Sequence, residues 1–215
     1  MPVGPADGRG GPGRADSKLI RAVDVFLLRH GETTGGERLR GRLDDALTEA
    51  GWAQMAMSAR RVLPVDALLS SPRLRCAAFA GDLAERAGIP LVIDARLREI
   101  DFGDWEGLPT AELARTAPAA LHAFWRDPYQ LTPPGGEPMT AFVGRLHAFW
   151  RDLVTQAPGA RVLIVAHGGV IRVLWAHAMG TREDDILRRP VAHGALFGLR
   201  VVAGTATPIA GMGMG

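Results

Sequence analysis

The stretch VDVFLLRHGETTGG, residues 23–36, places a strand-like run directly before a group of polar residues. The run VDVFLL has the length and apolar content of a strand that is covered on both faces. It ends on Arg29, His30 and Gly31: a guanidinium, an imidazole and a residue without a side chain. In open α/β sheets, ligands bind beyond the carboxyl ends of the strands. We therefore expect functional groups at the end of this strand.

Four further runs resemble strands: DALLSS (66–71), PLVID (90–94), VLIVA (162–166) and ALFGLRVVA (195–203). Stretches with helical periodicity fill most of the gaps between them. Such alternation is typical of an α/β fold with helices packed against a sheet. The pattern therefore predicts an α/β protein.

The order of these segments predicts one domain, residues 22–205, between two flexible tails. Residues 1–21 and 206–215 are rich in glycine and either proline or small residues, a composition that favours disorder. Residues 108–157 hold two helix-like stretches without a strand between them. We expect this segment to form a helical insertion over one end of the sheet.

Composition excludes several classes of protein. The single cysteine, Cys76, forms no internal disulfide and no thiolate metal cluster, which fits a reducing cytoplasm. No apolar run reaches the roughly 18 residues of a membrane span, and the first residues lack the apolar middle of a secretory signal. The net charge of +2 comes without a basic stripe for nucleic acid. We expect a cytoplasmic monomer or homodimer with neither a membrane nor a nucleic-acid partner.

A second strand-like run also ends on histidine. VLIVA continues into His167, Gly168 and Gly169. If this strand and the first lie parallel and close together, His30 and His167 meet in one crevice. One histidine at a strand end is usually a structural group, whereas two such His-Gly pairs beside Arg29 favour a functional site.

The stretch SSPRLRCAAF places Arg73 and Arg75 at the expected start of a helix. A helix start attracts anions through its free N–H groups, and the arginine fork matches paired phosphate oxygens. Arg73 taken alone is better explained as a solvated surface residue. With Arg29 and the two histidines, Arg75 predicts a site that holds a phosphoryl group.

The absence of other catalytic motifs from the sequence indicates the nucleophile. A cysteine phosphatase needs arginine six residues after its cysteine, but Asp82 stands there relative to Cys76. The sequence has no G-x-S-x-G elbow, no H-E-x-x-H zinc motif and no evident magnesium ligands. Histidine remains, and a neutral imidazole nitrogen can hold phosphorus as a phosphoramidate. We therefore expect no metal and no cofactor.

Five motifs in order carry a family resemblance: LLRHGET, GRLDDALTEAGWAQ, SSPRLRCA, LREIDFGDWEG and VLIVAHGGVI. Over residues 23–199 the chain resembles the histidine phosphatase superfamily, in its phosphoglycerate mutase-like branch. The resemblance implies a three-layer α/β/α sandwich with a mostly parallel sheet and a helical insertion. It also implies a metal-independent phosphomonoesterase that acts through phosphohistidine.

The resemblance assigns roles to individual residues. It makes His30 the nucleophile and lets Arg29, Arg75 and His167 hold the phosphoryl oxygens. Glu99 matches the proton donor of the family. A donor is needed because an alkoxide is a poor leaving group.

Two features of the expected site stay open. Asp101, Asp104 and Glu106 compete with Glu99 as the acid, although Glu106 suits a loop brace better. Where many family members have an asparagine that contacts phosphate, this chain has Gly36, and Thr33 or a backbone N–H is a candidate replacement.

Substrate contacts are suggested at a few positions. Arg40, Arg42 and Gly168 are candidates, but a solvated basic edge explains the two arginines equally well. Aromatic residues of the insertion can stack a benzimidazole-like base or can simply belong to the core; they are Phe124, Trp125, Phe149 and Trp150.

The sequences of these motifs are most similar to those of the alpha-ribazole phosphatase group, which removes the 5'-phosphate during assembly of the cobalamin nucleotide loop. Alternatives are a phosphoglycerate mutase-type phosphotransferase, a broad-specificity phosphatase of small molecules and a non-catalytic phospholigand binder. The partner implied by the resemblance is a small-molecule phosphate monoester.

Overall fold

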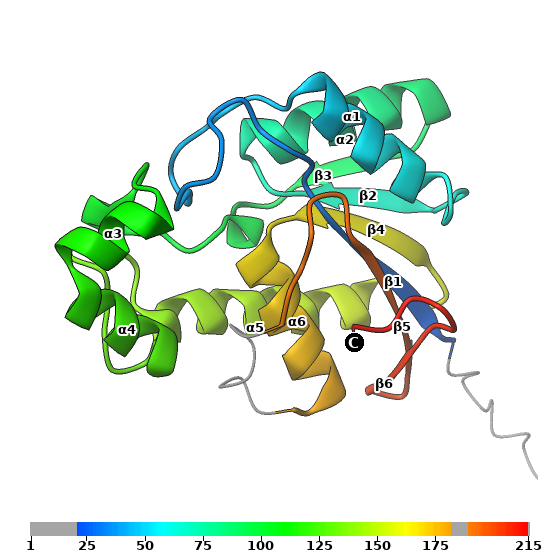
Figure 1. Cartoon of the computed structure of the whole chain (residues 1–215). Helices are drawn as coiled ribbons and strands as arrows, with labels where there is room; N and C mark the ends of the chain where they lie inside the picture. Colours follow the sequence, from blue (N-terminus) through cyan, green and yellow to red (C-terminus); the bar gives the residue numbers. More distant parts are fainter. Residues whose placement is uncertain (1–20, 182–188, 215) are drawn as a thin grey trace, which may run out of the picture.

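A computed structural model describes residues 21–181 and 189–214 of the chain. Its described residues form one six-stranded sheet in the order β3-β2-β4-β1-β5-β6 (Figure 1). The strands are β1 (Val23–Arg29), β2 (Ala67–Ser70), β3 (Leu91–Ile93), β4 (Arg161–Ala166), β5 (Leu196–Val202) and β6 (Thr205–Pro208). Strands β3, β2, β4 and β1 are parallel, whereas β5 and β6 are antiparallel to their neighbours. The mostly parallel sheet is confirmed.

Helices cover both faces of the sheet (Figure 1). Helices α1 (Glu49–Ala59) and α2 (Leu74–Ala87) lie on one face, and α5 (Met139–Gln156) and α6 (Gly168–Met179) lie on the other. Alternate residues of β1 serve the two layers: Phe26 and Leu28 join the core under α1 and α2, and Val25 and Leu27 join the other core. This alternation follows from the two-residue period of a strand, and it confirms the three-layer sandwich.

The helical insertion is shorter than the segment 108–157. Helices α3 (Thr110–Thr116) and α4 (Pro118–Arg126) project beyond the sheet, but α5 packs on its face (Figure 1). Pro118 begins α4 and interrupts the single helix that the periodicity suggested, because proline fits the first turn of a helix and not its interior. Two short 3-10 turns, η1 (Ala95–Leu97) and η2 (Gly103–Trp105), precede the insertion.

The two chain ends differ from each other. The expected N-terminal tail, residues 1–21, lies outside the described residues apart from Arg21. At the other end, residues 206–214 are not the flexible tail expected there. Residues 206–208 belong to β6, and Gly198 of β5 bonds to Ile209 and Met212 through its backbone. A Cβ at Gly198 would lie 3.1 Å from the Met212 sulfur and 3.2 Å from Ile209, so this glycine lets the segment run close to β5.

The sheet positions the groups of interest at one edge. Parallel strands β1 and β4 are neighbours in register, with Arg29 opposite Ala166. The backbone N–H of His30 donates to the carbonyl of Ala166 at 2.9 Å, so the pairing continues one step beyond β1. The residues that follow these two strands, His30 and His167, are therefore brought together.

Candidate active site

Two histidines from adjacent strand ends face each other. The ring centres of His30 and His167 are 5.3 Å apart with an edge-to-face arrangement. His30 is 4% exposed and His167 is fully buried. The expected convergence of the two imidazoles is present.

The backbone fixes the protonation of His30. Its Nδ1 lies 2.8 Å from the carbonyl oxygen of Gly31. Because a carbonyl only accepts, Nδ1 carries the proton and Nε2 keeps a free lone pair. Burial, and then the charges of Arg75 and Arg29, hold the pKa of His30 well below its usual value. His30 is thus a neutral imidazole with an available nitrogen.

His167 is held by the neighbouring strand end. Its Nε2 lies 2.8 Å from the Ser71 hydroxyl, and burial followed by the charge of Arg75 lowers its pKa well below the usual value. The Cys76 sulfur lies 3.8 Å from the same nitrogen. Burial raises the pKa of Cys76 to about 12, so this thiol stays protonated and is a poor nucleophile.

These two histidines make stability depend on pH. In the unfolded chain a histidine titrates near pH 6.5, but the folded protein keeps His30 and His167 neutral to lower pH. The unfolded state therefore binds more protons below pH 6.5. We expect the free energy of unfolding to be highest above this pH. It falls by up to about 1.4 kcal/mol per pH unit for each histidine as the pH decreases.

Urea denaturation between pH 7.5 and pH 5 measures this dependence. His167→Gln, whose amide can still reach Ser71, should reduce the slope, whereas His122→Gln at an exposed position should retain it. Equal unfolding free energies at the two ends of the range would contradict the assignment of neutral histidines.

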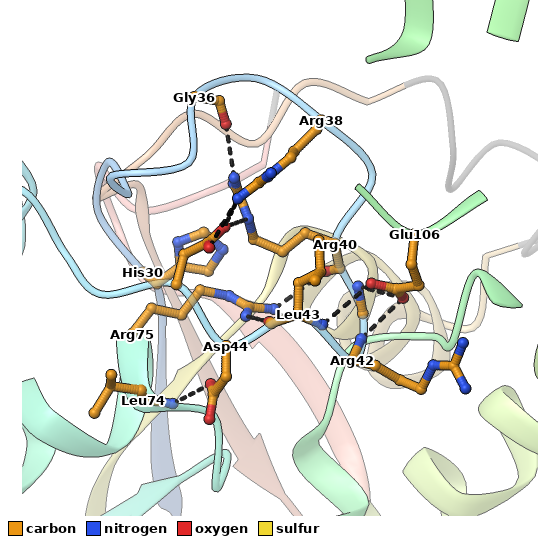
Figure 2. Close-up of polar contacts among 12 residues, drawn as sticks. His30, Gly36, Arg38, Arg40, Arg42, Leu43, Asp44, Leu74, Arg75 and Glu106 are labelled. Atoms are coloured by element: carbon orange, nitrogen blue, oxygen red, sulfur yellow. Dashed lines mark hydrogen bonds and ion pairs between the residues drawn. The ribbon is translucent and has the colours of Figure 1, made fainter. Parts of the chain in front are cut away.

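Two arginines surround the histidine pair. Arg75 is fully buried beside His30 and donates to the carbonyls of Leu43, at 2.7 Å, and Arg40, at 3.1 Å (Figure 2). Arg29 donates to the carbonyl of Val191. Within the described ranges, the buried Nε of each arginine has no hydrogen-bond partner. Burial lowers the pKa of Arg29 to about 10, which leaves it charged at neutral pH.

Helix α2 positions Arg75 and not Arg73 inside the site. The helix begins at Leu74 with Arg73 as its N-cap, so Arg73 itself lies just before the helix. The Ser71 hydroxyl accepts from the backbone N–H of Arg73 at 3.3 Å, which holds this turn outside the helix. Arg75 lies in the first turn and is buried, whereas Arg73 stays partly exposed.

Glu99 lines the same pocket as His30. One hollow is lined by Arg29, His30, Arg40, Glu99, Gly168 and Arg172, among others. Glu99 Oε2 accepts from the backbone N–H of Gly169, in the first turn of α6, at 2.9 Å. The carboxylate is therefore aimed at the helix that follows His167.

The competing acids are engaged elsewhere. Glu106 accepts from the backbone N–H groups of Gly41, Arg42 and Leu43 at 2.8, 2.9 and 3.1 Å, so it braces this loop as expected (Figure 2). Asp101 pairs with the guanidinium of Arg42 at 3.1 Å.

The structure does not bring Arg42 to the histidines, although the sequence made it a candidate substrate residue. Besides its pair with Asp101, its guanidinium bonds the carbonyl of Gly103, and it points away from His30 (Figure 2). Gly168, the other candidate, does line the pocket.

Arg38 is a site residue that the sequence analysis did not select, and Arg40 is one that it left open between a substrate contact and a solvated edge. Both line the His30 pocket and both pair with Asp45, at 2.8 Å each. Arg40 also donates to the carbonyl of Gly36 at 2.7 Å, at the position where an asparagine was expected. Their alternation along RLR was the available signal, since alternate residues of an extended segment share a side.

A neighbouring hollow adds His193 and Thr33 to this region. His193 lies with its ring centre 5.4 Å from that of His30. Thr33 is 3% exposed, and its hydroxyl has no hydrogen-bond partner in the part of the chain that the structure describes. Thr33 thus stays a candidate for a phosphate contact.

Between residues 21 and 181 and between 189 and 214, no helix combines the length and apolarity needed to cross a membrane. Over the same ranges, no three histidine, cysteine, aspartate or glutamate side chains are grouped as metal ligands would be.

Comparisons with known proteins identify relatives. The chain is 37% identical over 169 residues to bifunctional protein Rv2228c of Mycobacterium tuberculosis, covering 76% of this chain but only 46% of that protein. It is 36% identical over 193 residues to glucosyl-3-phosphoglycerate phosphatase of Mycobacterium tuberculosis, covering 83% and 82%. The solved alpha-ribazole phosphatase of Shigella flexneri matches with a TM-score of 0.75 and 27% identity, over 86% and 94% of the two chains.

The family model covers nearly all of the described fold. Residues 25–208 match the histidine phosphatase superfamily (branch 1), and this range contains both strand-end histidines, Arg75 and Glu99. The fold has the three layers and the mostly parallel sheet that the motif resemblance implied. The chain therefore belongs to the histidine phosphatase superfamily, branch 1.

Proposed function

We propose that this protein hydrolyses phosphate monoesters through a phosphohistidine formed on His30. The observation that supports this best is the unprotonated Nε2 of His30, which lies in a buried, arginine-rich pocket. Arg29, Arg75 and His167 bind the phosphoryl oxygens and neutralise the charge that builds up during transfer.

In the first step, His30 Nε2 forms a bond to phosphorus and the bond from phosphorus to the ester oxygen breaks. Glu99 gives its proton to the departing oxygen, so the alcohol leaves uncharged. In the second step, Glu99 takes a proton from water as the water oxygen attacks phosphorus. The bond to Nε2 then breaks, and orthophosphate leaves with His30 restored.

The role of Glu99 gives a test that leaves Glu99 itself unchanged. A Cβ at Gly169 would lie 2.3 Å from Glu99 Oε1, so Gly169→Ala must displace this carboxylate. We expect kcat for alkyl phosphates to fall by about 10²-fold, the lower end of general acid catalysis. Phosphate release measures the effect. Gly81→Ala in α2, where a Cβ meets open space, is the control. Unchanged turnover in Gly169→Ala would contradict the role of Glu99.

For the substrate, we propose α-ribazole 5'-phosphate, in assembly of the cobalamin nucleotide loop. The sequences of the motifs and the structural similarity to the Shigella flexneri alpha-ribazole phosphatase support this substrate. The mycobacterial glucosyl-3-phosphoglycerate phosphatase is the strongest argument for a different ester, because it shares more sequence identity. The two substrates differ in the alcohol that departs, which is where an assay can separate them.

A panel of esters tests the proposal. Phosphate release in the presence of EDTA should show a higher kcat/KM for α-ribazole 5'-phosphate than for glucosyl-3-phosphoglycerate or phosphoglycerates. A preference for glucosyl-3-phosphoglycerate would overturn the substrate, and a broad, flat profile would favour a general phosphatase. Phosphoryl transfer to a second hydroxyl would show a mutase. Phosphate binding without turnover would show a phospholigand binder.

Other expectations stay predictions from the sequence. They are a cytoplasmic location, a monomer or homodimer, no nucleic-acid partner and independence from metals and cofactors. The lone cysteine, Cys76, and the scattered basic residues support them.

A further inference from the structure

An apolar hollow adjoins the pocket of His30. Its wall includes Phe102, Phe124, Trp125, Tyr129, Phe142 and Val173. Four residues line both this hollow and the pocket of His30: Glu99, Phe102, Trp125 and Arg172. The two spaces are therefore adjacent, and Glu99 lines both of them.

The sequence HAFWRD occurs twice, at residues 122–127 and 147–152. Trp125 differs from the other aromatic residues of these two stretches. Phe124, Phe149 and Trp150 are buried in the core, as their helical spacing suggested. Trp125 is 36% exposed and rests edge-to-face on Phe124, with ring centres 5.4 Å apart. Helix α4 projects beyond the sheet (Figure 1). Its Trp125 thus lines the hollow with an indole that Phe124 supports.

The proposed chemistry sets the direction of the departing alcohol. The leaving oxygen lies opposite His30 Nε2 in an in-line displacement, and it must reach Glu99 for its proton. The carbon skeleton of the alcohol then extends past Glu99. The apolar hollow is the space beyond the His30 pocket that Glu99 also lines.

The lining selects the kind of alcohol that fits. Sugar hydroxyls buried against phenylalanine and valine side chains would lose their hydrogen bonds to water without replacement, at a cost of about 1–3 kcal/mol each. A flat apolar ring instead gains burial and a stacking contact with an indole. Arg172 lines both spaces. Its positive charge can bind a polar group that connects the ring of the alcohol to the phosphate.

Building on the proposed function, we propose that this hollow binds a flat apolar ring on the departing alcohol, and that Trp125 is a specificity-determining residue that stacks on the ring. The substrate class is a phosphate monoester whose alcohol carries an aromatic group. α-Ribazole, with its benzimidazole base, is in this class, and a glucosylglycerate is not.

The test compares two alkyl esters with purified full-length protein. 2-Phenylethyl phosphate carries a ring, and glycerol 2-phosphate carries hydroxyls. We expect the wild type to have at least about a tenfold higher kcat/KM for the phenylethyl ester. Trp125→Ala should lower this ratio about tenfold, and Trp125→Phe should restore most of it. Met57→Ala, at a 67% exposed position of α1, should leave both rates unchanged.

A binding measurement tests this inference independently of the proposed function. Calorimetry measures the binding of 3-phenylpropylphosphonate and of methylphosphonate and needs no turnover. The wild type should bind the phenylpropyl compound more tightly than methylphosphonate. Trp125→Ala should lose this difference in affinity. If no ester is hydrolysed but this difference is observed, the proposed function fails and the ring-binding hollow stands. If esters are hydrolysed and Trp125→Ala changes neither the kinetic ratio nor the binding difference, the hollow is not a ring site.

Discussion

His30→Ala is expected to lower kcat for p-nitrophenyl phosphate by at least about 10⁴-fold, as loss of a covalent nucleophile does in other enzymes. No neighbouring group can take over. His167 is committed to Ser71 through Nε2, and the Cys76 thiol, with a pKa of about 12, stays protonated. His193 faces His30 but lies with its ring centre 5.4 Å away.

Release of nitrophenolate measures this loss directly. His122→Ala removes an exposed histidine on α4 and should keep kcat within about twofold, since surface substitutions usually have small effects. The melting temperature of His30→Ala should stay near that of the wild type, because alanine removes a neutral buried ring without leaving a charge. Turnover of His30→Ala near the wild-type rate would show that the nucleophile is another group.

Glu99→Gln is expected to slow different esters to very different extents. An alkyl alcohol needs a proton as it leaves, so kcat for alkyl phosphates should fall by about 10²- to 10⁴-fold. Nitrophenolate leaves without one, and its ester should lose less than about tenfold in the phosphorylation step. Glutamine keeps an oxygen that can accept from the Gly169 N–H, so the shape of the pocket is retained.

Rapid-mixing measurements of the phosphorylation step separate this effect from a slower second step. Asp104→Asn, an exposed carboxylate five residues further along, is the matched control and should slow neither ester. An equal loss for both kinds of ester in Glu99→Gln would assign proton donation to another group.

Much of the fold could be predicted because its signals are local. The five runs that indicated strands correspond to β1 through β5, and Thr48 caps α1 by accepting from the Gly51 N–H at 3.0 Å. Strand β6 was missed because its sequence, TATP, is held by pairing with β5 and not by its own preference. Helix α5 was assigned to the insertion because periodicity shows an apolar face but not the surface that the face meets.

The candidate site likewise contains residues that local sequence signals could predict and residues that they could not. His30, His167 and Arg75 follow strand ends or open a helix, so sheet topology alone brings them together. Arg42 lies in a loop whose course is set by distant partners, and no pattern within the loop specifies these. Glu106, more than sixty residues away in the chain, orients the backbone around Arg42.

Gly31, next to the proposed nucleophile, is required by packing. In the structure, a Cβ at this position would lie 2.1 Å from the carbonyl oxygen of Gly51. The missing side chain therefore allows the start of α1 to pack against the turn that holds His30.

Trapping of the phosphoenzyme tests the central claim most directly. Full-length protein mixed with a ³²P-labelled monoester, denatured within milliseconds and digested at alkaline pH, should give one labelled peptide containing His30. The bond should be labile to acid and stable to base, as expected of a phosphoramidate, and His30→Ala should give no label. Label on another residue, or hydrolysis by a protein that never becomes labelled, would contradict the phosphohistidine mechanism.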